Sequence, residues 1–204
     1  MLLFALLASL LLVGLGSYFL LAHWNKRQEK AMQIQWQFLL DEYALQSLSA
    51  EEDEAFFRLA AKGELAGFPL YMEQYSRSAN KADSYQFFAE LSLPKNSPKT
   101  YLGQETLLSQ IQAEMGWIDI QIGEAKLDEQ FLLRSENEAF VHQLLNEELI
   151  HQLLRLERQW KGHFEWEADK LRFEASAILL DAEDLKWAKA MLNLLALLAK
   201  KTIK

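Results

Sequence analysis

The first 22 residues constrain the fold of this chain most strongly, because none of them has a charged side chain. A helix rises about 1.5 Å per residue, so such a segment extends about 33 Å, enough to cross a hydrocarbon core about 30 Å thick. The sequence therefore predicts a transmembrane helix over residues 1–22.

A cleaved signal peptide is the alternative interpretation of this segment. Signal peptides normally begin with a positive charge, have a shorter apolar run and end at a site with small residues. No Lys or Arg precedes the run here, and the sequence Gly-Leu-Gly-Ser-Tyr within it makes a poor cleavage site. We expect a retained anchor, and cleavage stays open as the alternative.

Basic side chains follow the apolar run immediately, at Lys26, Arg27 and Lys30, and Trp24 stands beside them. Lys and Arg next to a span favour the cytoplasmic side, and tryptophan favours the membrane–water interface. No later apolar run is long enough to cross back. The sequence therefore predicts a single-pass protein of the cell (inner) membrane that contacts membrane lipid and has a cytoplasmic C-terminal domain.

The body of the protein is acidic. The formal charge of the whole chain is −8, and residues 1–30 contain three basic residues and one acid, so the remainder carries −10. Proteins that bind nucleic acid present a basic face to the phosphates. The acidic remainder therefore argues against a nucleic-acid partner.

Residues 23–48 have the pattern of a helical stalk. Met32, Trp36, Leu39 and Tyr43 recur at intervals of four, three and four, which places them on one face of a helix.

A second helix is predicted over residues 49–63. Ser49 and Glu52 have the spacing of a capping box, acids fill the first turn, and Gly63 is a terminator.

Three later helices are predicted from the same kind of spacing. The first ends at Gly116. The second begins with Ser135 as its cap and breaks near Asn146, and the third covers residues 182–200 with Asp181 as its cap.

Strand periodicity appears between these helices. Residues 85–93 alternate apolar and polar side chains, and a turn-rich loop is predicted over residues 94–99. Residues 117–135 predict two strands around a Gly-Glu-Ala-Lys turn, and residues 163–176 predict a hairpin that turns near Asp169.

Helices and strands follow one another without the regular repeat of a parallel fold. The predicted fold class is therefore α+β, with an antiparallel sheet packed by helices. The predicted units are a transmembrane helix over residues 1–22, a juxtamembrane stalk over residues 23–48 and one α+β domain over residues 49–204.

Two stretches, FPLYMEQYSRSAN and DEQFLLRSENEAFVHQLLNEELIHQLL, carry a resemblance within about residues 56–175. They resemble bacterial membrane-anchored proteins of unknown function, in which one or two spans precede a small domain. This chain has one predicted span where many such proteins have two. The resemblance implies location and architecture, and no activity or cofactor comes with it. The positions that carry the second stretch are Phe131, Ser135, Leu144, Leu145, Leu149 and Leu153.

The sequence predicts no metal site. Glu147 and His151 lie four residues apart on one helix face, with Glu148 nearby, but a site needs a further ligand from elsewhere. We expect a solvated Glu–His pair on the surface of the helix.

The sequence also predicts no catalytic residue and no cofactor. It contains no Cys, no G-x-S-x-G elbow and no glycine-rich phosphate loop. Four acids gather near the Gly-Glu-Ala-Lys turn and could share proton transfer if one were buried, but we expect them to be solvated. These acids are Asp119, Glu124, Asp128 and Glu129.

The final helix has a wide apolar surface. At 100° per residue its apolar side chains cover an arc of about 200°, whereas a surface helix needs roughly 100°. One sheet face cannot cover such an arc, so either other helices of the chain or a partner must cover the second side. The possible partner face consists of Trp187, Met191, Leu194 and Leu198.

These features favour a non-enzymatic accessory or interaction protein whose partner is another protein or a second copy of the chain. Two alternatives stay open: a subunit of a secretion- or pilus-like membrane assembly, and a membrane-proximal enzyme of unrecognised type. A pocket with several convergent polar groups of shifted pKa would favour the enzyme.

Overall fold

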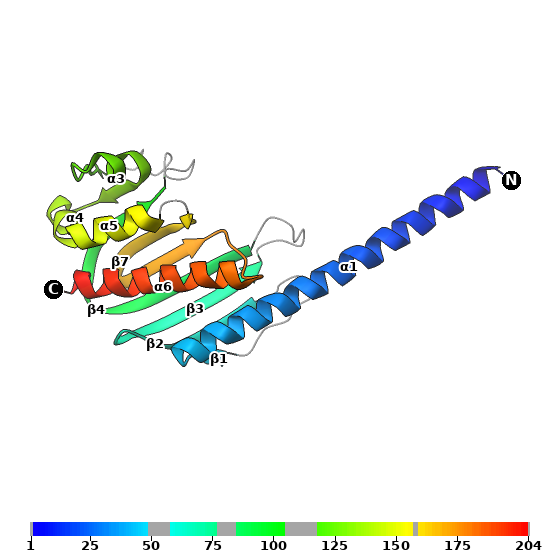
Figure 1. The fold of residues 1–204 in the computed structure, drawn as a ribbon, viewed down its shortest axis with the longest axis horizontal. Coiled ribbons are helices and arrows are strands. Elements are labelled where there is room, and N and C mark those ends of the chain that lie inside the picture. Colours follow the sequence, from blue (N-terminus) through cyan, green and yellow to red (C-terminus); the bar gives the residue numbers. More distant parts are fainter. Residues whose placement is uncertain (1, 49–57, 77–84, 105–117, 157–158, 204) are drawn as a thin grey trace.

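The computed structural model describes residues 2–48, 58–76, 85–104, 118–156 and 159–203. These residues form an α+β fold with an antiparallel sheet, as the sequence predicts (Figure 1). The elements are α1 (Leu2–Tyr43), β1 (Gln46–Leu48), β2 (Arg58–Leu65), β3 (Phe68–Ser76), β4 (Tyr85–Gly103), β5 (Ile118–Asp119), α3 (Ala125–Gln130), β6 (Leu132–Ser135), α4 (Glu138–Leu144), α5 (Glu147–Leu156), β7 (His163–Ala175) and α6 (Ala182–Thr202).

Helix α1 runs without a break for 42 residues and projects from the domain as a rod (Figure 1). In the part of the chain that the structure describes, no helix is long and apolar enough to cross a membrane. The predicted transmembrane helix over residues 1–22 is therefore corrected, and lipid contact through such a span loses its support. The basic residues after the apolar run do not begin a separate stalk, because they lie within the same helix.

The C-terminal half of α1 belongs to the globular unit. Met32, Trp36 and Leu39 are buried at the helical spacing that the sequence predicts. After the helix, β1 pairs with β2, with Gln46 opposite Lys62. The predicted stalk of residues 23–48 is therefore not a separate unit, because its C-terminal part packs in the core and contributes β1. The globular unit begins within α1 rather than at residue 49.

Residues 58–65 form strand β2, where the sequence analysis predicts a helix. Leu59, Ala61 and Leu65 point alternately into the core. Ala66 and Gly67, with φ of 56° and 93°, form a two-residue turn that joins β2 to β3. Turns with positive φ at both central residues match the twist of a hairpin, so this pairing overrides the local helical signals. The rest of the predicted helix lies outside the described residues, as does the helix predicted to end at Gly116.

Strand β4 extends 19 residues and includes residues 94–99, which the sequence analysis assigns to a loop. It runs antiparallel to β7, and the register between them shifts on either side of Ser97. Strand β7 bends at Ala168, where φ is 52°, close to the turn predicted near Asp169. The two arms of this bend pair with β4, however, so the predicted hairpin is not formed within β7 in the described sheet.

The bend divides the sheet into two parts that share β4 and β7. In the first part, β3 and the C-terminal arm of β7 flank the beginning of β4. In the second part, β6 and the N-terminal arm of β7 flank its end. Helix α6 packs on β4 and β7 and contacts both α1 and α4 (Figure 1). The core between the helices and the sheet is aromatic and includes Phe87, Phe164, Trp166, Phe173 and Trp187.

The segment around Gly-Glu-Ala-Lys is a helix rather than a turn between two long strands. The carboxylate of Asp128 on α3 accepts hydrogen bonds from the backbone N–H groups of Ile122 and Gly123, both at 2.8 Å. These bonds hold the loop against the helix, which leaves only the short strands β5 and β6 on either side.

Of the three helix boundaries predicted at Ser135, Asn146 and Asp181, the last two are confirmed. The carboxylate of Asp181 accepts from the N–H groups of Glu183 and Asp184, and the predicted break at Asn146 separates α4 from α5. Ser135, however, ends β6, where its hydroxyl lies 2.7 Å from that of Thr100. Asn137 caps α4 in its place.

Candidate interaction surface

Helix α1 has two apolar stripes on opposite sides. One contains Met32 and Trp36 and is buried in the core. The other contains Trp24, Ile34 and Phe38, whose exposed fractions are 61%, 47% and 53%. At 100° per residue the centres of the two stripes are about 140° apart. The second stripe therefore faces away from the domain that the helix packs against.

The three exposed side chains and the half-buried Ala31 lie along one side of the helix. Trp24, Ala31 and Phe38 are seven residues apart, and Ile34 lies between the last two. A seven-residue interval is nearly two helical turns, which is the spacing of the contact line in paired helices. We call Trp24, Ala31, Ile34 and Phe38 the outer stripe.

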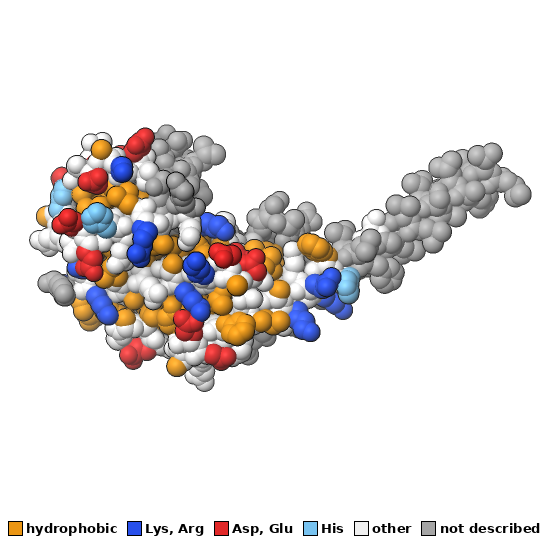
Figure 2. All heavy atoms as spheres, viewed as in Figure 1, with side chains coloured by type: hydrophobic (Ala, Val, Ile, Leu, Met, Phe, Trp, Pro, Cys, Tyr) orange, Lys and Arg blue, Asp and Glu red, His pale blue; other side chains and the backbone are white. Residues whose placement is uncertain are grey.

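Charge is distributed unevenly along the outer stripe. Lys26, Arg27 and Lys30 are exposed near its N-terminal end, and Figure 2 shows basic side chains gathered where α1 leaves the domain. The acids lie at the other end: Asp41 accepts a hydrogen bond of 2.8 Å from Gln37, and Glu42 forms an ion pair with Lys189. Of the residues predicted to mark a membrane junction, Trp24 therefore lies in the outer stripe, Arg27 and Lys30 lie within it or at its border, and Lys26 is exposed on another side of the helix.

The predicted partner face on α6 lies in the core. Trp187, Met191, Leu194 and Leu198 are all at most 5% exposed. Helix α6 contacts the sheet on one side, and α1 and α4 on others. The wide apolar arc is therefore covered by other elements of the same chain, which was the first of the two alternatives.

A buried polar cluster lies on the second part of the sheet. Tyr101 and Arg134 are almost fully buried and lie opposite each other on β4 and β6. The ring of His163 stacks on Tyr101, with ring centres 5.0 Å apart. None of these three residues stands out in the sequence, because strand alternation does not reveal which polar residues become buried.

Burial changes the proton affinities in this cluster. It raises the pKa of Tyr101, an effect that the nearby Arg134 guanidinium opposes. It lowers the pKa of His163, although Glu174 and Glu165 favour the protonated imidazole. The cluster therefore favours a neutral tyrosine stacked on a neutral histidine.

The cavity next to this cluster is small. Its volume is about 130 Å³, and its polar lining includes Asp119, Asp128, Glu129 and Arg134. Pockets for small molecules usually measure about 300–1,000 Å³. The fourth acid of the predicted group, Glu124, lines a different and larger surface groove between α3 and α5, of about 620 Å³. The fold therefore brings three of the four acids to one small cavity and places Glu124 elsewhere.

The Glu–His pair on α5 is exposed. The Nε2 atom of His151 lies 4.0 Å from a carboxylate oxygen of Glu147, and the two side chains are 75% and 92% exposed. Among the described residues, no three His, Cys, Asp or Glu side chains come together as metal ligands.

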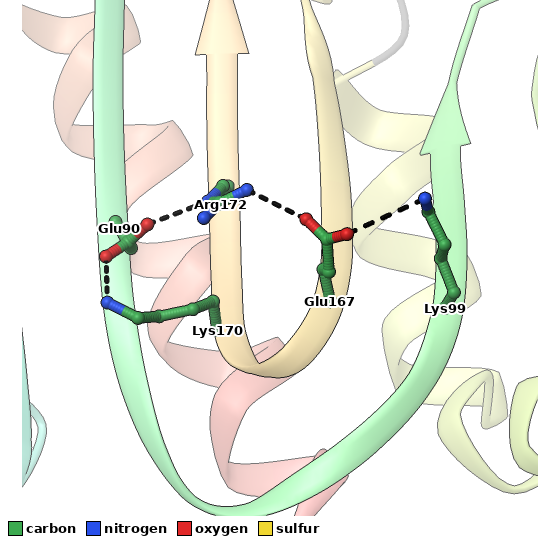
Figure 3. A network of polar contacts seen from close by, with 5 residues as sticks. All are labelled: Glu90, Lys99, Glu167, Lys170 and Arg172. Atoms are coloured by element: carbon green, nitrogen blue, oxygen red, sulfur yellow. Dashed lines mark hydrogen bonds and ion pairs between the residues drawn. The ribbon is translucent and has the colours of Figure 1, made fainter.

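A second polar network crosses the bend of the sheet (Figure 3). Glu90 on β4 binds both Lys170 and Arg172 on β7, and Arg172 reaches Glu167 on the other arm of β7 at 3.1 Å. Glu167 in turn lies 3.6 Å from Lys99. Burial raises the pKa of Glu90, but the two cations together outweigh it and hold the pKa below its ordinary value. These side chains bind one another, so their role is to join the two arms.

No protein-family model matches the chain. No curated protein matches it either. Among solved structures it is similar to the crystal structure of the mycobacterial trehalose monomycolate transport factor A, TtfA, with 8% sequence identity and a TM-score of 0.44. The match covers 84% of this chain and 94% of that one. Neither a family nor an activity follows from a likeness of this size.

Proposed function

We propose that this protein is a non-enzymatic accessory protein that binds another protein through the outer stripe of α1. The observation that carries the proposal is the exposure of Trp24, Ile34 and Phe38 on the side of α1 that faces away from its own domain. Single exposed apolar residues are common on protein surfaces, but apolar patches bordered by polar residues mark interaction sites. Aromatic residues and arginine are also the types enriched at such sites.

The polar clusters give less support to an enzyme. The residues with shifted pKa on the second part of the sheet, Tyr101 and His163, stack on each other. The cavity beside them is smaller than an ordinary substrate pocket. A binding role therefore accounts for the exposed surface of the molecule without requiring chemistry from this cluster.

The proposal can be tested by site-specific photocrosslinking in cells that express the full-length chain. A photoreactive phenylalanine analogue would replace Ile34 or Phe38, and matched control variants would carry it at Gln33 or Gln37, which are exposed on other sides of α1. We expect discrete crosslinked protein bands from the two outer-stripe positions and weak or no bands from the two controls.

Equal crosslinking from all four positions would contradict the proposal, because a specific interface is directional. As a further control, Trp24→Glu combined with Ile34→Glu should remove the crosslink from position 38 while the thermal unfolding curve stays unchanged. A crosslink that persists in this variant would also count against binding through the outer stripe.

A further inference from the structure

The geometry points to the kind of partner that the outer stripe binds: an amphipathic helix of another protein, with acidic side chains bordering its apolar face where it lies beside Arg27 and Lys30. This inference rests on the proposed function and adds the chemistry of the partner.

The shape of the surface favours a helix. The outer stripe is about 21 Å long between Trp24 and Phe38 at 1.5 Å per residue, with Trp24, Ala31 and Phe38 at seven-residue spacing and Ile34 beside this line. Two helices bury a contact line of this kind by packing along each other. A strand would add to a sheet edge such as β1, but the outer stripe lies on the side of α1 away from the sheet. A flat partner would contact only the outermost atoms of the stripe.

The charge of the surface favours acids on the partner. On a helical wheel Arg27 lies within the outer stripe and Lys30 at its border, while Gln28 and Gln35 form the opposite border. The acid nearest the other end of the stripe, Asp41, is held by Gln37. Charged residues that flank a helix contact line select partners of opposite charge. A partner with acids beside Arg27 and Lys30 is therefore complementary.

A second copy of this chain fits less well. Arg27, Ile34 and Asp41 share one position of the seven-residue repeat. A parallel pair of α1 helices would place Arg27 against the second copy's Arg27 and Asp41 against the second copy's Asp41, and like charges repel at such positions. An antiparallel pair that sets Ala31 against the second copy's Ile34 would place the Asp41 carboxylate against the second copy's Trp24 and Arg27 against the second copy's Phe38, with both charges turned away from water.

Two synthetic helical peptides can test the charge preference. Both carry the same Leu and Ile contact line, but one has Glu and the other Lys at all flanking positions. Fluorescence anisotropy with the labelled peptides and the full-length chain should show at least about tenfold tighter binding of the Glu peptide, an effect that falls with salt. The double variant Arg27→Glu/Lys30→Glu should reverse this preference, whereas Lys26→Glu, about 125° from the centre of the outer stripe, should keep it.

The variants Phe38→Glu and Ile34→Glu should each weaken binding of both peptides and leave the thermal unfolding curve unchanged. Two separate variants are used so that a folding defect in one of them does not decide the test. Equal affinity for the two peptides, or preference for the Lys peptide, would overturn the inference. Sedimentation that shows a dimer of the chain alone, lost in Phe38→Glu, would overturn it in favour of a second copy.

The two proposals fail in different ways. If neither peptide binds but crosslinking in cells still depends on the outer stripe, the helical acidic partner is wrong and the proposed function stands. If crosslinking shows no dependence on the outer stripe, the proposed function itself is wrong.

Discussion

Helices α1 and α6 pack on the same sheet, yet the apolar surface of α6 is buried by its own chain, whereas α1 keeps an apolar stripe exposed to solvent. Helix α6 lies over the middle of the sheet, on β4 and β7, and it has helical neighbours in α1 and α4 (Figure 1). Helix α1 lies over β2 and has α6 beside it, so its far side has none of these neighbours. The width of an apolar arc therefore measures how much of a helix must be covered, while the position of the helix in the fold decides what covers it.

The largest expected effect comes from the buried helix. Replacing Leu194 and Leu198 together by Gln removes two core side chains and buries two amides. Each leucine lost from a core costs about 3 kcal/mol or more, and a whole domain has only about 5–15 kcal/mol of stability. We therefore expect an unfolded or aggregated protein by circular dichroism and limited proteolysis. A double variant that retains its melting temperature would contradict the contrast between the two helices, because this face of α6 would then behave as an exposed surface.

The two sides of α1 can be compared directly through their tryptophans. Trp36 is 3% exposed, so Trp36→Ala should cost about 3–5 kcal/mol in the free energy of unfolding. Trp24 is 61% exposed, so Trp24→Ala should change it by less than about 0.5 kcal/mol. Urea denaturation of both variants measures the difference. Similar losses in both would mean that Trp24 is covered in solution.

A smaller effect is expected at the start of α6. The carboxylate of Asp181 accepts hydrogen bonds of 2.9 and 3.0 Å from the N–H groups of Glu183 and Asp184. Asp181→Ala should therefore lower the free energy of unfolding by about 1 kcal/mol, and Asp181→Asn, which keeps the capping oxygen, should lower it much less. Thermal melts of the two variants separate the contribution of the cap from that of core packing. An equal loss of unfolding free energy in both variants would show that Asp181 stabilises the protein by something other than its cap hydrogen bonds.

The smallest effect is expected on the outer stripe. Ile34→Gln combined with Phe38→Gln should change the free energy of unfolding of the free chain by no more than about 0.5 kcal/mol per site. It is the matched counterpart of the α6 double variant, with two apolar residues replaced by Gln in each. A loss of several kcal/mol here would show that the outer stripe is covered within the chain and would remove the basis of the proposed binding role.

The parts of the fold that the sequence predicts correctly are those in which local signals agree with packing. In α6 the periodicity, the Asp181 cap and the apolar arc all indicate the same helix. In β2 the local signals fail, because Ser49 and Glu52 suggest a helix while residues 58–65 gain more from pairing with β3. Local patterns do not contain that pairing, and they also do not show that β4 continues through the Pro-containing segment around Ser97.

The candidate surface could be predicted only in part. The seven-residue spacing of Trp24, Ala31 and Phe38 is visible in the sequence, but so is the second periodicity through Met32 and Trp36. Only the packed structure shows which of the two is buried. The cluster of Tyr101, Arg134 and His163 was not predictable, because its members come from three strands and meet only through the register of the sheet.

The bend shared by β4 and β7 has a consequence for how the molecule opens. Each arm of β7 is hydrogen-bonded to β4, and Arg172 and Glu167 connect the two arms across the bend (Figure 3). Neither half of the sheet can detach without losing strands that the other half also needs. We therefore expect the backbone amides of both arms to exchange with solvent deuterium in one cooperative event, at a free energy close to that of global unfolding. In energetic terms the two halves of the sheet then constitute a single folding unit, although the bend gives them the shape of two.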